Sequence, residues 1–118
     1  LSVSSKANAL ILFNPVMHLE PLAQRMADPE MARRITPNLH LAPGIPPAIL
    51  FYGDKDPFVE GGKEFVARMK ELGGRAEIHV SPDQVHGFFN RPPFLEETLW
   101  KSDEFLVSLG YLPPKPKE

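Results

Sequence analysis

Two side chains suited to proton-transfer chemistry, a carboxylate and an imidazole, occur in the middle of the chain as Asp56 and His86. A carboxylate that accepts a hydrogen bond from one imidazole nitrogen fixes the tautomer and orientation of the ring. The other nitrogen can then take the proton of a nucleophile. This chemistry requires the two side chains to lie on neighbouring loops, so it depends on the elements around positions 56 and 86.

The acid follows a short, wholly apolar segment. Residues 48–52, Ala-Ile-Leu-Phe-Tyr, end at Gly53 and are typical of a strand that helices cover on both faces. The turn after them, residues 53–58, places Asp54 and Asp56 at the carboxyl end of that strand. Two carboxylates are also what an ordinary Asp-rich turn contains. The turn by itself leaves a catalytic and a structural interpretation open.

A helix and a second strand separate the acid from the histidine. Residues 61–72 carry apolar side chains at helical spacing, and two glycines follow them as a stop signal. Residues 76–80 predict the second strand, which leads into the loop containing His86. Because a strand–helix–strand crossover is right-handed and keeps its strands parallel, Asp56 and His86 are expected at one edge of the sheet. Asp83, three residues before the histidine, is an alternative acid.

Three further segments complete the expected fold. Residues 9–13 are another apolar run, closed by Asn-Pro, and predict a third buried strand. Residues 18–41 contain several prolines and form either a cap over the sheet edge or an irregular connection. Residues 94–109 predict a closing helix. Its apolar stripe is expected to contain Leu95, Leu99, Leu106 and Leu109, with Trp100 and Phe105 at the margins. The fold class is therefore α/β, with about three parallel strands and flanking helices.

The composition is that of an ordinary globular protein. The 118 residues are 42% hydrophobic and 24% charged, with a formal net charge of −2, which gives no electrostatic case for nucleic acid. One domain is expected over residues 1–118, with residues 1–8 as a lead-in and 113–118 as a tail. No apolar run is long enough to span a membrane, and a chain without cysteine is compatible with any compartment. His18 and His40 have no partner at metal-ligand spacing, so no metal or other cofactor is expected.

Several motifs follow one another along residues 7–112. They are Leu10-Ile-Leu-Phe-Asn-Pro15, Thr36-Pro37-Asn-Leu-His40, Pro46-Pro47, Gly53-x-x-Asp56-x-x-Val59, Gly73 and His86-Gly-Phe-Phe-Asn90. In this order they resemble the C-terminal part of an α/β-hydrolase-fold esterase or lipase of the acetyl-esterase and acetyl-xylan-esterase type. The resemblance implies that Asp56 is the triad acid and His86 the general base of a carboxylic-ester hydrolase. It also suggests that Phe58, Phe88 and Phe89 line an acyl or alcohol pocket, unless they pack beneath the loops.

The nucleophile of that family is absent from this sequence. In the family it is a serine in a Gly-x-Ser-x-Gly turn, which precedes the matching region, as does the oxyanion hole. None of the serines here has that setting: Ser2, Ser4, Ser5, Ser81, Ser102 and Ser108. Since the first residue is Leu rather than Met, a processed, renumbered or truncated start is expected. The chain is therefore predicted to hold the acid and base of a small-molecule esterase and to be inactive alone.

Two other functions are compatible with the motifs. One is a non-catalytic α/β-hydrolase remnant or interaction module, and the other is part of a prolyl-oligopeptidase-type serine peptidase, which shares the Gly-x-x-Asp and His-Gly pattern. The Phe-Asn-Pro strand end and the His-Gly-Phe-Phe-Asn turn favour the esterase. In the family's sheet the strand at residues 9–13 has two neighbours, of which this chain contains one. Its open edge is expected to form a homo-oligomer or to pair with the rest of the enzyme.

Overall fold

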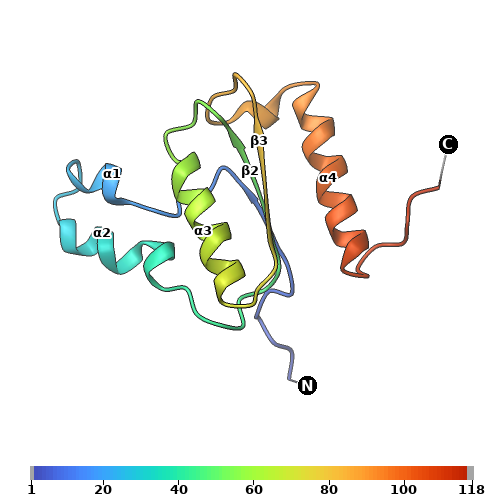
Figure 1. The fold of residues 1–118 in the computed structure, drawn as a ribbon, viewed down its shortest axis with the longest axis horizontal. Coiled ribbons are helices and arrows are strands. Elements are labelled where there is room, and N and C mark those ends of the chain that lie inside the picture. Colours follow the sequence, from blue (N-terminus) through green and yellow to red (C-terminus); the bar gives the residue numbers. More distant parts are fainter. Residues whose placement is uncertain (1, 117–118) are drawn as a thin grey trace.

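A computed structural model describes residues 2–116, the side chain of Pro21 excepted. Its strands, in spatial order, are β1 (Leu10–Phe13), β2 (Ala48–Gly53) and β3 (Ala76–Ser81), and each neighbouring pair is parallel. Helix α3 (Val59–Glu71) covers one face of the sheet and α4 (Phe94–Ser108) the other (Figure 1). The predicted fold class is confirmed.

The central strand, β2, contributes to two separate cores. Every one of its residues is buried. Leu50 and Tyr52 pack with α3, whereas Ile49 and Phe51 pack with Phe105 of α4. A parallel strand covered on both faces needs apolar side chains at successive positions rather than at alternate ones. This requirement explains the unbroken apolar run that marks the strand in the sequence.

Tyr52 fixes the start of α3 against β2. Its hydroxyl donates a hydrogen bond to the Pro15 carbonyl oxygen at 2.6 Å, and its ring occupies the space that a Cβ at Gly62 would need. Burial raises the pKa of the Tyr52 phenol far above its ordinary range, and the nearby charge of Asp56 acts in the same direction. α3 begins at Val59, two residues before the predicted Gly61.

The closing helix lies where it was predicted, but the prediction of its buried face was only partly right: Leu106 and Leu109 are half-buried, and Leu109 packs against the core. Leu95 and Leu99 are 40% and 51% exposed, while Thr98, Ser102 and Phe105 are buried. The hydroxyls of Thr98 and Ser102 each donate to a carbonyl one turn earlier in the helix, at 2.8 and 2.7 Å. Because these hydroxyls are satisfied within the helix, their burial leaves no unpaired polar group. Their small side chains form the face of α4 on which Phe105 is the main apolar anchor.

The segment between β1 and β2 lies beside α3 (Figure 1). It contains α1 (Glu20–Ala23), α2 (Pro29–Ile35) and a 3₁₀ turn (Pro37–Leu39). Asp28 caps α2 by accepting the backbone N–H groups of residues 30 and 31 at 3.0 and 3.1 Å. No helix in the described part of the chain is long and apolar enough to cross a membrane.

A polar cluster attaches this segment to α3. The fully buried Asn38 donates from Nδ2 to the Gly61 carbonyl at 2.9 Å and to the Glu64 carboxylate at 3.2 Å. Arg68 donates to the Asn38 carbonyl at 3.0 Å, and His18 Nδ1 lies 3.2 Å from Glu64 Oε2. The hydrogen bond with His18 is the main reason why the pKa of the Glu64 carboxyl is below its ordinary value. His18 therefore belongs to the hydrogen-bonded cluster that joins this segment to α3. Residues 2–116 contain no group of three or more His, Asp or Glu side chains that could hold a metal ion.

Candidate active site

The turn after β2 buries the carboxylate of Asp56. The Asp56 N–H donates to the Gly53 carbonyl at 3.1 Å, and its own carbonyl accepts the first N–H of α3, from Val59, at 3.2 Å. The side chain is completely buried, with Oδ1 accepting the Phe58 N–H at 2.8 Å and Oδ2 2.8 Å from His86 Nδ1. Both carboxylate oxygens therefore have defined partners, as a buried carboxylate requires.

The loop after β3 carries His86 to the same edge of the sheet. The N–H groups of Asp54 and Lys55 donate to the carbonyls of Ser81 and Gln84, both at 3.0 Å, which ties the turn after β2 to the turn after β3. Gly87 then adopts a left-handed φ of 85°, a conformation that glycine reaches without steric cost. The expected meeting of positions 56 and 86 at one sheet edge is what the structure shows.

The geometry of the pair leaves one imidazole nitrogen available. With Asp56 accepting from Nδ1–H, the neutral ring carries its lone pair on Nε2. The His86 side chain is 49% exposed, and Nε2 has no hydrogen-bond partner among residues 2–116. A half-exposed imidazole oriented by a buried carboxylate can remove a proton from a hydroxyl or a water molecule, and can return it later in the reaction.

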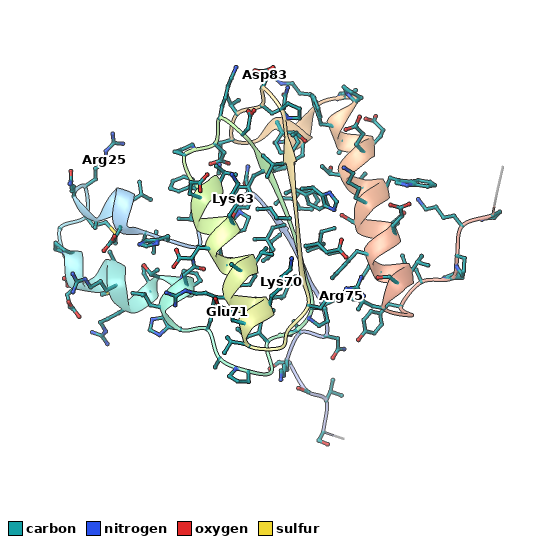
Figure 2. All side chains as sticks on the ribbon, in the orientation of Figure 1. Arg25, Lys63, Lys70, Glu71, Arg75 and Asp83 are labelled. Carbon is teal, nitrogen blue, oxygen red and sulfur yellow. The ribbon has the colours of Figure 1, made fainter. Side chains whose placement is uncertain are left out.

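The other two aspartates near this edge have different settings. Asp54 is exposed in the turn. Asp83 is also exposed, and its carboxylate pairs with Lys55 Nζ at 3.2 Å instead of with His86. Figure 2 shows Asp83 in the turn after β3, at the opposite end of the strand from Arg75. The structure therefore pairs the histidine with Asp56 and not with the alternative acid.

The three phenylalanines considered for a substrate pocket lie at different depths. Phe58 is half-buried and its ring meets the His86 ring edge-on, with 5.8 Å between centroids. Phe88 is 5% exposed and packs with Phe51 and Phe105 under the loop, while Phe89 is half-buried against Phe13. These positions favour a packing role for Phe88. Only Phe58, among the three, has its ring against a member of the acid–histidine pair.

Two residues support the pair through contacts that the sequence does not reveal. Gly53 is needed because a Cβ there would overlap the backbone carbonyl of Gln84 in the histidine loop. Asn14, the residue after β1, contacts the N–H of Gly87 through its side-chain amide. In the sequence Asn14 indicates the end of a strand and belongs to the Phe-Asn-Pro motif, and neither feature points to Gly87. Its partner is more than seventy residues away, and no local pattern reports a contact at that separation.

The fold and the pair define a class of protein. It is a parallel α/β sheet with a hydrogen-bonded carboxylate and histidine on adjacent loops at the carboxyl ends of its strands, the place where such sheets form their sites. A profile of the family described as alpha/beta hydrolase fold matches residues 5–90. The chain belongs to this family.

Solved structures of an esterase from the Planctomycetes species Thermogutta terrifontis are similar to the chain. The propionate-bound form is 36% identical with a TM-score of 0.80, covering 97% of this chain and 47% of that one. The butyrate-bound form is 34% identical with a TM-score of 0.81, covering 98% and 48%. The apo form of esterase 2 is 38% identical with a TM-score of 0.81, covering 95% and 46%. The chain thus spans about half the length of these relatives. A comparison with curated proteins gives no match.

Proposed function

We propose that the chain is the part of a carboxylic-ester hydrolase that provides the triad acid, Asp56, and the general base, His86. The observation that carries this proposal is the 2.8 Å contact between His86 Nδ1 and Asp56 Oδ2, in a half-exposed histidine whose Nε2 has no hydrogen-bond partner within residues 2–116. The relation to esterases supports ester hydrolysis over peptide hydrolysis. The propionate- and butyrate-bound states of the relative support a short acyl chain, as in acetyl-esterase-type enzymes.

In this mechanism a serine hydroxyl and an oxyanion hole come from residues other than these 118. His86 Nε2 removes the serine proton while the serine oxygen attacks the ester carbonyl, and Asp56 stabilises the imidazolium that forms. The imidazolium then protonates the departing alkoxide, so an alcohol leaves and an acyl-enzyme remains. Water, deprotonated by the same Nε2, attacks the acyl group, and the proton returns to the serine as the carboxylic acid leaves. Phe58, beside the imidazole, would contact the acyl or alcohol group.

A chimera tests this function. Residues 2–116 would replace the corresponding segment of the Thermogutta terrifontis esterase, to which they are 34–38% identical. We expect the chimera to hydrolyse p-nitrophenyl propionate and butyrate and to leave aminoacyl-proline amides intact. Cleavage of the amides instead would favour the peptidase, and a folded chimera with no turnover of either substrate would favour the non-catalytic remnant.

The 118 residues alone are expected to show negligible turnover of p-nitrophenyl esters. Without a serine nucleophile and oxyanion donors, the base can only activate water, and those two elements normally account for most of the rate enhancement. A spectrophotometric assay of the isolated chain beside its His86→Ala variant checks this. Robust hydrolysis that disappears in the variant would show that the chain is a catalyst in its own right.

The outer edge of β1 is a second feature that supports an interaction with another chain segment. The Leu10 N–H donates to the carbonyl of Pro47, just before β2, at 2.8 Å. The Asn14 N–H donates to the carbonyl of Phe51, within β2, at 2.7 Å. In the alternating pattern of a strand, the N–H groups of Ile11 and Phe13 then point away from β2. Within residues 2–116 no strand pairs with that side. The other edge strand, β3, carries Glu77 and a histidine, and charged side chains discourage edge pairing.

We propose that the β1 edge pairs with a strand of a second copy or of the remaining part of the enzyme. The isolated chain is therefore expected to self-associate at high concentration, because an apolar open edge recruits another strand. Light scattering across a concentration series measures the mass directly. A monomer at every concentration would count against pairing through this edge.

A further inference from the structure

Asn14 is held at the carboxyl end of the sheet in an uncommon conformation. Its backbone N–H donates to the Phe51 carbonyl of β2 at 2.7 Å, so its place is fixed by the sheet. Its φ of 41° lies in the left-handed region, which asparagine tolerates better than most residues other than glycine. This conformation brings the side-chain amide of Asn14 to the loop that carries His86.

The amide of Asn14 makes two hydrogen bonds there. With the amide oriented to suit its neighbours, Nδ2 donates to the Phe13 carbonyl at 2.7 Å and Oδ1 accepts the Gly87 N–H at 2.8 Å. The opposite orientation of the amide would set the oxygen against a carbonyl and the nitrogen against an N–H. The hydrogen-bond network therefore determines the assignment of the amide atoms.

The bond to Gly87 acts on His86 through the backbone. The Gly87 N–H and the His86 carbonyl belong to one planar peptide unit, so fixing that N–H fixes ψ of His86. The Gly87 carbonyl is held as well, by the Asn90 N–H at 3.2 Å and by its side-chain amide at 3.1 Å. Gly87 is thus restrained on both sides, and the backbone of its neighbour His86 has little freedom to turn the imidazole away from Asp56.

We propose that Asn14 is a positioning residue for His86. It links the end of β1 to the peptide that follows the histidine and thereby keeps Nδ1 within hydrogen-bonding distance of Asp56. This inference rests on the proposed function, in which His86 is the general base, but its test does not require ester turnover.

The test compares two variants of the chain by NMR. Asn14→Gly keeps the left-handed backbone accessible and removes the side chain with its amide. We expect the hydrogen-exchange protection of the Gly87 amide to fall by about tenfold, as for loss of one hydrogen bond. The ring ¹⁵N shifts of His86, assigned by their absence in His86→Ala, should lose the preference for the Nδ1–H tautomer. In Asn14→Asp one carboxylate oxygen can still accept the Gly87 N–H, although the other replaces the Nδ2 donor opposite the Phe13 carbonyl. The tautomer preference should therefore fall less than in Asn14→Gly, and the Gly87 amide shift should follow the titration of the introduced carboxyl group.

Each variant can overturn the proposal by itself. Asn14→Gly would do so if the Gly87 protection or the His86 tautomer preference stayed at the wild-type level. Asn14→Asp, which decides the matter if the glycine variant does not fold, would do so if the Gly87 amide shift did not respond to pH. Asn8→Gly, at an exposed asparagine, serves as the control and should match the wild type. An inactive chimera would contradict the ester hydrolase and leave these NMR results standing.

Discussion

Replacing His86 by alanine in the chimeric esterase is expected to lower kcat for p-nitrophenyl butyrate by about 10⁶-fold, since loss of the general base disables the whole catalytic unit. Replacing Asp56 by asparagine should lower kcat by about 10⁴-fold. The amide oxygen of the new residue can still accept the Phe58 N–H that now bonds Oδ1 at 2.8 Å. Its NH₂ group would then face Nδ1, favouring the tautomer with the proton on Nε2, where no further proton can be taken.

The alternative acid gives a matched control for this pair of variants. Asp83→Asn removes a carboxylate three residues from His86, but that carboxylate is exposed and pairs with Lys55. A surface ion pair contributes little, so Asp83→Asn should keep both the melting temperature and kcat. Steady-state kinetics and thermal unfolding of the three variants decide between the acids. A large loss in Asp83→Asn with an active Asp56→Asn would reassign the acid to Asp83.

The parts of the fold that follow from local patterns could be predicted from the sequence. The apolar runs that became β1 and β2, the glycine stop after α3 and the parallel crossover are each encoded within a few neighbouring residues. The crossover alone also brings positions 56 and 86 to one edge, because parallel strands present their carboxyl ends together. Their hydrogen bond of 2.8 Å is a consequence of that topology and of the loop contacts.

The features that escaped prediction depend on how side chains pack and bond in the folded chain rather than on a local pattern. The buried face of α4 was mispredicted in its first half because Leu95 and Leu99 were taken to mark it, whereas Thr98 and Ser102 satisfy their hydroxyls within the helix and are buried. The bond from Asn14 to Gly87 depends on a left-handed residue whose side-chain direction no periodicity reveals. Such contacts are set by tertiary packing, which overrides local preference.

Gly53, the last residue of β2, affects both the acid–histidine site and the stability of the sheet. Its side-chain position is filled by the histidine loop: a Cβ would overlap the carbonyl carbon and oxygen of Gln84. That carbonyl already accepts the Lys55 N–H at 3.0 Å. Since φ of Gly53 is not in the left-handed region, alanine is compatible with its backbone, and the effect of the substitution is steric.

Gly53→Ala is therefore expected to lower the free energy of unfolding by about 3 kcal/mol, the upper part of the usual range for overpacking, because a backbone atom must move. The displaced loop should also take His86 away from Asp56, so the His86 ring should lose its Nδ1–H tautomer preference even in the folded fraction. Urea unfolding and ring ¹⁵N shifts measure the two effects.

Gly44→Ala is the control: no atom lies within 4 Å of the position a Cβ would take there, but the φ of Gly44 is +92°. It should cost about 1 kcal/mol through the backbone alone and leave His86 unchanged. A Gly53→Ala protein as stable as Gly44→Ala, with His86 undisturbed, would mean that the loop can shift without loss and that Gly53 does not hold the acid and the base together.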